Sequence, residues 1–298
     1  MAPSTDPIAE VPHQLIGLDE FITAFAQQVY PEDISRLSPD THLIDDLGFD
    51  SLHMLVAMEW IEELIPSISV LPDSDILSAL STLRHAHNFY LAESCAPVSD
   101  ADLKRDKSSG LVVSLRPVRP DDLPYLYELV VRDEHAVRWR FQGALPSYDE
   151  FVRSFSTSVF TQLVVTSKRD SHPIGIVVAH NASLINRTTY LSALVSPQNA
   201  VPGPGAEAVR LFADYLFRTW EFEKVCMEVP EFNIGQFQSG LGDILDVEGC
   251  LKKHLYCDGR RWDQYIVTIH RSRFRDRWPL SSRIHTHLGR SSSTQEGD

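Results

Sequence analysis

A short turn-forming run at residues 46–52 constrains the fold of this chain more than any other stretch. It reads Asp-Leu-Gly-Phe-Asp-Ser-Leu, with Gly48 suited to a tight turn and two leucines suited to anchor the turn on an apolar core. Asp50 and Ser51 are both residue types that cap helices. The run therefore predicts a turn that ends where a helix begins, with Ser51 exposed at its head.

The residues after this turn predict an amphipathic helix. Apolar positions recur at three- and four-residue spacing, while acidic residues occupy the other side. Two interpretations of Ser51 follow from the local pattern. It is either only the N-cap of this helix, or an exposed serine whose hydroxyl is held for chemistry. The apolar positions are Leu52, Leu55, Val56, Met58, Trp60, Ile61, Leu64 and Ile65.

The run from Thr41 to Leu52, with Glu59 and Glu62 downstream, resembles the acyl carrier protein signature around its Asp-Ser-Leu motif. The resemblance spans roughly residues 15 to 92, and it implies an all-α four-helix bundle. It also implies that Ser51 carries a covalent 4′-phosphopantetheine arm, attached by a phosphopantetheinyl transferase. Acidic residues on the following helix would then receive basic partner enzymes.

The charge of the chain is concentrated in its first hundred residues. These hold two basic residues against seventeen acidic ones, whereas the remainder is nearly balanced, and the whole chain has a net charge of −14. Such a field disfavours nucleic acid and favours basic protein surfaces, although selection for solubility alone is an alternative. We expect no nucleic acid and no membrane partner, and a cytoplasmic location.

The cysteine pattern and the segment boundaries can also be predicted from the sequence. The four cysteines show no pairing or metal-ligand pattern, so we expect free thiols and no metal site. With 298 residues the chain is long enough for two domains. The predicted segments are a disordered N-terminus (1–14), the carrier domain (15–92), a linker (93–110), an α/β domain (111–270) and an Arg/Ser-rich, partly disordered tail (271–298).

From residue 111 onward the pattern changes to alternating strands and helices. Three successive apolar, β-branched strands precede a helix and a further strand, which indicates a meander followed by a crossover. The predicted strands are 111–116, 163–167, 174–180, 188–195 and 224–229. The predicted helices are 121–134, 148–158 and 206–221.

A glycine-containing turn lies between the fourth of these strands and the helix that follows. Gly203, Gly205 and Ala206 precede or begin this helix. Small residues there allow backbone N–H groups to approach a phosphate, which the helix dipole favours. By itself the pattern is more typical of an ordinary turn.

Residues 111 to 270 resemble the GNAT acyltransferase superfamily, especially its ribosomal-protein N-acetyltransferase-like branch. The resemblance implies an α/β fold with a mixed, mainly antiparallel sheet. It also implies that Leu194 and Val195 bind a pantetheine arm, and that Gly203, Gly205, Ala206 and Asn233 contribute to acyl-coenzyme A binding. The matching positions are Leu115-Arg116-Pro117, Asp121-Asp122, Val195-Ser196-Pro197, Gly203-Pro204-Gly205-Ala206, Asn233 and the run from Glu248 to Tyr265.

This chain departs from the family pattern at two places. Ala200 stands where the family loop usually has Arg or Gln, and Pro204 between the glycines has no N–H to donate. Free coenzyme A binding is therefore expected to be weakened. In addition, the stretch 234–241 contains Phe237 but no tyrosine, so the usual acid for the departing thiolate is missing or is supplied from elsewhere.

Aminolysis of a thioester needs an unprotonated amine, an oxyanion donor and a proton source for sulfur. Glu228, His180 and His254, in that order, are the candidate catalytic residues. Each also has a structural interpretation: a partner of a nearby cation for Glu228, a strand-end polar residue for His180, and a surface side chain for His254. Asp263 and Tyr256 are candidates for supporting roles.

The sequence therefore predicts an acyltransferase that carries an acyl thioester on the arm of Ser51 and transfers it to the amine of a small metabolite in a biosynthetic pathway. Two alternatives remain open. The GNAT half loads an acyl group from acyl-coenzyme A onto the carrier thiol, or it is inactive and displays the carrier to other enzymes that dock on its acidic surface. The pattern also leaves open whether the carrier serves its own chain or another copy.

Overall fold

The computed structural model describes residues 15–30, 37–65, 79–94, 110, 112–132, 141, 143–196 and 203–279. The chain divides into two compact units, and strands β2, β3 and β4 and helix α8 run through both. The first unit comprises residues 1–157, 162–178 and 193–212, and the second comprises 158–161, 179–192 and 213–298. The predicted N-terminal segment and most of the predicted linker and tail lie outside the described residues.

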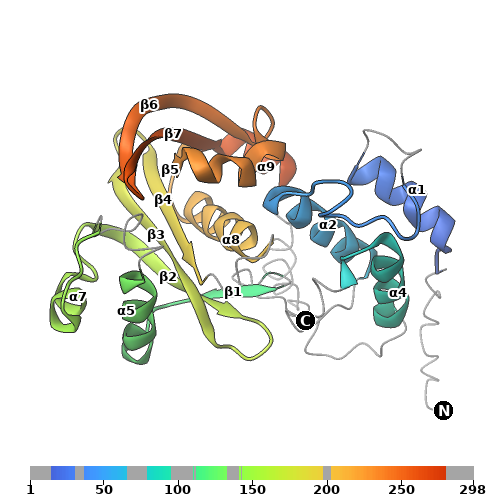
Figure 1. The fold of residues 1–298 in the computed structure, drawn as a ribbon, viewed down its shortest axis with the longest axis horizontal. Coiled ribbons are helices and arrows are strands. Elements are labelled where there is room, and N and C mark those ends of the chain that lie inside the picture. The colour runs from blue at the N-terminus through green and yellow to red at the C-terminus, as the bar shows by residue number, and fades with distance from the viewer. Residues whose placement is uncertain are drawn as a thin grey trace, which may run out of the picture. The chain divides into compact units, whose positions relative to one another are not determined.

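Three helices occupy the described N-terminal part of the first unit (Figure 1): α1 Leu18–Gln28, α2 Ser51–Leu64 and α4 Leu83–Ser94. Phe21 and Phe25 of α1 are fully buried and pack edge-on against Trp60 of α2, with ring centroids 4.9 and 5.6 Å apart. Phe21 also contacts Tyr90 of α4. One aromatic cluster thus joins the three helices, as the apolar spacing of the sequence predicts.

The turn before α2 has the expected geometry, but its capping residue is Asp50. The Asp50 carboxylate accepts hydrogen bonds from the backbone N–H of Leu52 and His53, and Ser51 is the first helical residue. Gly48 has φ +67°, which favours glycine. The interpretation of Ser51 as the N-cap is therefore wrong, because the longer carboxylate one residue earlier reaches the same donors.

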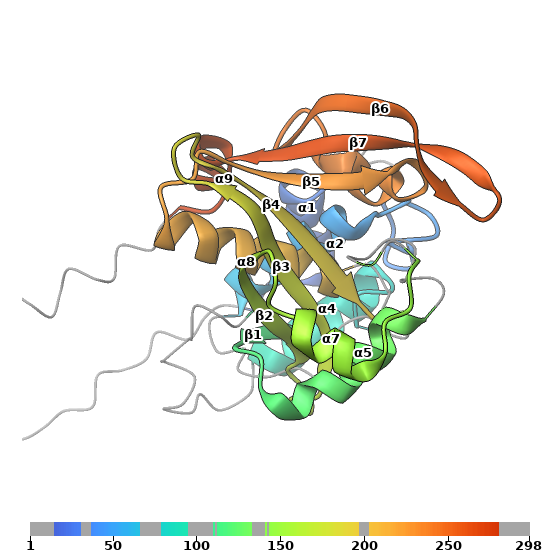
Figure 2. The same ribbon diagram turned by 90° about the vertical axis from the view of Figure 1, so that its left-hand side faces the viewer.

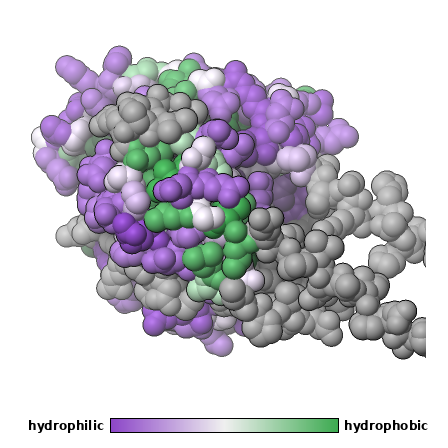
Figure 3. Space-filling model, turned by 90° about the vertical axis from the view of Figure 1, so that its right-hand side faces the viewer, coloured by the Kyte–Doolittle hydropathy of each residue, from purple (hydrophilic) through white to green (hydrophobic). Residues whose placement is uncertain are grey.

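The surface of the described N-terminal residues is not uniformly polar. Leu15 and Ile44 are each 44% exposed. Figure 3 shows one face of the molecule, on which hydrophobic and hydrophilic residues both lie at the surface.

The strands form one seven-stranded mixed sheet in the order β1-β2-β3-β4-β5-β7-β6. The predicted meander followed by a crossover is confirmed, since β2, β3 and β4 are sheet neighbours in sequence order and β5 pairs parallel to β4. The strands are β1 Val113–Arg116, β2 Val159–Ser167, β3 Pro173–Ser183, β4 Thr188–Val195, β5 Lys224–Pro230, β6 Leu245–Cys257 and β7 Arg260–His270.

Helical segments lie between these strands or, in the case of α9, after the last of them: η2 Pro120–Asp122, α5 Leu123–Val131, α7 Tyr148–Ser154, α8 Pro204–Thr219, η4 Glu231–Gly240 and α9 Arg271–Arg277. The single helix predicted over 121–134 is divided into η2 and α5, because Pro120 and Pro124 start two successive turns. Helix α9 occupies the first residues of the predicted tail.

Strand register determines which side chains share a face. β4 and β5 pair in parallel over their first three residues, up to Tyr190 and Cys226. β5 continues to pair with β7 along its whole length, and β7 pairs with β6 (Figure 2). Within the described residues no helix is long and apolar enough to cross a membrane.

Candidate functional site

Ser51 occupies the first position of α2 and is partly exposed. Its neighbour Asp50 is held by the two capping hydrogen bonds, and His53 stacks on Phe49 with ring centroids 4.8 Å apart. Phe49 is buried in the helical core. The backbone on both sides of Ser51 is thus fixed without using its hydroxyl for the cap, which suits a serine that receives a modification.

The glycine turn is built around Gly203 at the entry to α8. Its φ of +125° is a conformation that L side chains rarely adopt, and its carbonyl accepts the first helical hydrogen bond from the Glu207 N–H at 2.8 Å. Pro204 opens the helix without an N–H, so the first-turn donors come from Gly205 and Ala206. These two amides are suited to an anion.

Glu207 anchors this turn to the rest of the first unit. Its side chain is 1% exposed, and one carboxylate oxygen accepts hydrogen bonds of 2.9 Å from the N–H groups of both Val112 and Val113. Lys168 donates to the carbonyl of Gly110, at 2.8 Å. The end of the predicted linker is therefore fixed beside the first turn of α8.

Leu194 and Val195 end β4, in the first unit. Leu194 is buried, and Val195 is partly exposed. Gly175 of β3 lies so close that a Cβ there would stand 2.3 Å from the Leu194 carbonyl oxygen. A side chain at residue 175 would displace this strand, so glycine sets the position of the backbone that the resemblance associates with the pantetheine arm.

A polar cluster lies on one sheet face in the second unit. The His180 Nε2 atom lies 3.0 Å from the Ser192 hydroxyl oxygen, and the His180 ring stacks on Tyr190 with centroids 5.9 Å apart. All three side chains are partly exposed. This arrangement orients the imidazole and keeps it accessible, as proton transfer requires.

Glu228 lies on β5, exposed, and accepts a 2.8 Å hydrogen bond from the side-chain amide of Gln264 on β7. Gln264 is 8% exposed, so its amide is a fixed donor. The carboxylate is thereby oriented by an uncharged partner. This contact of Glu228 is with an uncharged amide and not with a cation, contrary to the structural interpretation of this residue.

Tyr190 is the phenol that sequence reasoning missed. Burial raises its pKa, and the nearby carboxylates of Glu228 and Glu248 also raise it, while Lys224 acts in the opposite direction. The hydroxyl is therefore protonated at neutral pH and able to donate. Alternation along β4 places Tyr190 and Ser192 on one face, and this is the signal that could have found them.

The other residues that the sequence suggested for the site make none of the contacts described above. His254 is exposed on β6, within a register shift between Leu251 and Leu255. Asn233 is partly exposed in η4, which is a 3-10 segment. Asp263 accepts hydrogen bonds from the Lys252 ammonium at 2.7 Å and from the Lys253 N–H at 2.8 Å. These contacts join β7 to β6.

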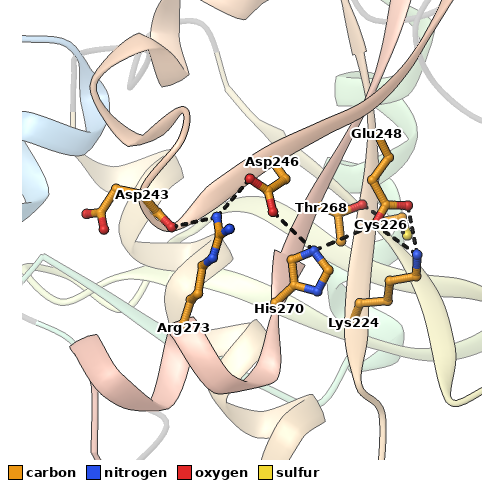
Figure 4. A network of polar contacts seen from close by, with 8 residues as sticks. All are labelled: Lys224, Cys226, Asp243, Asp246, Glu248, Thr268, His270 and Arg273. Atoms are coloured by element: carbon orange, nitrogen blue, oxygen red, sulfur yellow. Dashed lines mark hydrogen bonds and ion pairs between the residues drawn. The ribbon is translucent and has the colours of Figure 1, made fainter.

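A second polar network joins β5, β6, β7 and α9 (Figure 4). The His270 Nε2 atom lies 3.3 Å from Asp246 and 3.6 Å from Glu248, and Lys224 binds Glu248 at 2.7 Å. Arg273 binds Asp246 at 2.7 Å. These contacts cross-link the three strands and α9. In the same part of the chain, Thr268 donates to Cys226.

Among the described residues, no group of three or more His, Cys, Asp and Glu side chains is arranged to hold a metal ion. The three cysteines of this part, Cys226, Cys250 and Cys257, are free thiols.

Residues 113–238 match the family described as Acetyltransferase (GNAT) domain. Over this segment the chain is similar to that family. The segment contains the glycine turn and the strands that position His180 and Glu228, so the prediction of an acyltransferase enzyme is confirmed. The acyl carrier domain and the ribosomal-protein branch remain predictions.

Solved structures are also similar to a part of this chain. Spermidine N-acetyltransferase from Vibrio cholerae in complex with CoA and spermine is 20% identical, with a TM-score of 0.48, over 54% of this chain and 97% of that one. A probable GNAT-family acetyltransferase from Chromobacterium violaceum is 17% identical, with a TM-score of 0.46, over 57% and 90% of the two chains. No curated protein matches the sequence.

Proposed function

We propose that residues 15–92 are an acyl carrier domain with a four-helix bundle, and that the GNAT domain transfers an acyl group from a phosphopantetheine arm on Ser51 to the amine of a small metabolite. The observation that carries the proposal is the geometry at Ser51. Asp50 caps α2 in its place, so the serine of an Asp-Ser-Leu motif stands at a rigid helix start with its hydroxyl released from capping.

The polar cluster of His180, Ser192 and Tyr190 supplies the acid and base for acyl transfer to the amine. The amine attacks the thioester carbonyl, the C–S bond of the tetrahedral intermediate breaks, the amine loses a proton, and the thiolate gains one. His180, oriented by Ser192, accepts the proton from the amine, and the Tyr190 hydroxyl donates to sulfur. Glu228 binds the cationic form of the acceptor before deprotonation.

The experiment is single-turnover transfer from acetylated holo protein to a panel of primary amines that includes n-propylamine and 1,4-diaminobutane, followed by intact mass. His180→Ala is expected to slow loss of the acetyl group about 10²- to 10⁴-fold, the usual contribution of a general base. His254→Ala is the matched control and is expected to react as the wild type does. Equal effects of the two substitutions would contradict the assignment of His180.

A second function is favoured by one observation, the Gly205 and Ala206 amides at the start of α8. Such a turn suits the pyrophosphate of acyl-coenzyme A. The GNAT domain would then transfer the acyl group from acyl-coenzyme A to the thiol of the carrier arm. Acetyl-coenzyme A incubated with the holo protein in the absence of amine distinguishes the two: a gain of one acetyl group on the arm supports loading, and no gain supports transfer to an amine.

A further inference from the structure

Helix α2, which begins at Ser51, contacts the first half of α8 within the first unit. The Arg210 Nε atom lies 3.1 Å from the Glu59 carboxylate, and the two side chains are only 18% and 14% exposed. A charged pair this well covered is less screened by salt than a pair on an open surface. The contact therefore joins the helix of the proposed carrier to the helix that follows the glycine turn.

An apolar contact accompanies this ion pair. Met58 precedes Glu59 on α2 and is 1% exposed, and a Cβ added to Gly203 would stand 3.3 Å from its sulfur. The Met58 side chain thus lies against the glycine turn itself. An ion pair beside a buried methionine has the composition of a specific interface, with an apolar centre and a charged neighbour.

The connecting segment is fastened at the same place. Glu207 binds the N–H groups of Val112 and Val113, and Lys168 binds the carbonyl of Gly110. Residues 95–109 join α4 to this anchor and span at most about 50 Å when extended. A tether of this length fixed beside α8 keeps the two partners at roughly millimolar effective concentration.

We propose that Arg210 and the Gly203 turn form the docking surface for the carrier region of the same chain, so that the acyl group on Ser51 is delivered in cis. This inference rests on the proposed function. When the carrier is docked, Met58 lies against Gly203 of this turn. Arg210 recognises the donor and takes no part in the chemical step.

The first test reverses the charge at the interface. With acetyl on the Ser51 arm and the amine panel as acceptor, Arg210→Glu is expected to lower the single-turnover rate about tenfold or more, and the swap Glu59→Arg with Arg210→Glu to restore most of it. Arg218→Glu, in the same helix but paired with Asp214, is the matched control. With S-acetylpantetheine as a free donor, all variants are expected to react equally. An Arg210→Glu rate equal to wild type with the arm-borne donor would overturn the inference.

The second test mixes two chains. Ser51→Ala protein, with an intact site, is combined at micromolar concentration with acetylated holo protein carrying His180→Ala. Delivery in cis predicts that the mixture keeps its acetyl groups over many wild-type half-lives, whereas transfer at the wild-type rate would show delivery between chains and overturn the inference.

A third measurement separates docking from catalysis. Hydrogen exchange over residues 204–210 is expected to accelerate in Arg210→Glu and to slow again in the charge swap, whether or not any amine is acylated. Failure of the wild-type chain to transfer, with this exchange pattern present, would refute the proposed function alone. An exchange pattern that Arg210→Glu does not change would refute the docking surface.

Discussion

Glu207 allows the sharpest prediction about how the donor side of the site is held. Its buried carboxylate accepts two 2.9 Å hydrogen bonds, from the backbone N–H groups of Val112 and Val113. Hydrogen bonds to a charged group contribute about 1.5–3 kcal/mol each, so Glu207→Ala is expected to lower the free energy of unfolding of this unit by about 3–6 kcal/mol. This is a large fraction of the 5–15 kcal/mol typical of a domain.

The assay is urea unfolding together with hydrogen exchange at residues 112 and 113. In Glu207→Ala these two amides lose their acceptor, so their exchange is expected to accelerate by several orders of magnitude, while amides in β7 change much less. Glu207→Gln keeps a carbonyl acceptor and is expected to lose about 1–2 kcal/mol. A Glu207→Ala protein with unchanged exchange at residues 112 and 113 and a loss below about 1 kcal/mol would refute the reasoning.

Two further perturbations test other parts of the first unit. Arg116 binds both carboxylate oxygens of Asp122 at 2.8 Å, and this hydrogen bonding lowers the pKa of Asp122. The pair therefore stabilises the fold at pH values above the ordinary Asp pKa near 4, and this stabilisation is lost as the pH falls through the lower pKa of the folded state. Asp122→Asn is expected to lower Tm at pH 7 and to reduce the decline of Tm between pH 5 and 3, and an unchanged pH profile would contradict this. Gly175→Ala would place a Cβ 2.3 Å from the Leu194 carbonyl, so Tm should fall by several degrees and acyl transfer should slow, whereas Gly235→Ala, with no atom within 4 Å, should change neither.

The sequence predicted the parts of the fold that depend on local periodicity. Strand β4 has the predicted bounds, 188–195, because alternating apolar and polar residues require one register. The helix after Ser51 begins where the turn residues predict it. Other boundaries were predicted wrongly. At 121–134 the prolines divide one predicted helix into η2 and α5, the helix predicted over 148–158 ends at Ser154, and the strand predicted over 163–167 begins at Val159.

The candidate site was predicted less completely, because its contacts join residues distant in sequence. Gln264 lies 36 residues from Glu228, and the pairing of Glu228 depends on the register of β5 with β7. Capping by Asp50 could not be told from capping by Ser51, since both residue types satisfy the same N–H groups. The pair of Glu59 with Arg210 depends on tertiary packing that no periodic pattern specifies.

The measurement that tests the central claim most directly is the intact mass of the protein after incubation with coenzyme A and a broad-specificity phosphopantetheinyl transferase, beside a Ser51→Ala control. The account predicts a gain of about 340 Da, the mass of a phosphopantetheine arm, in the wild type and no gain in the control. Absence of this gain in a folded wild-type protein, or an equal gain in Ser51→Ala, would contradict the claim that Ser51 bears the acyl-carrying arm.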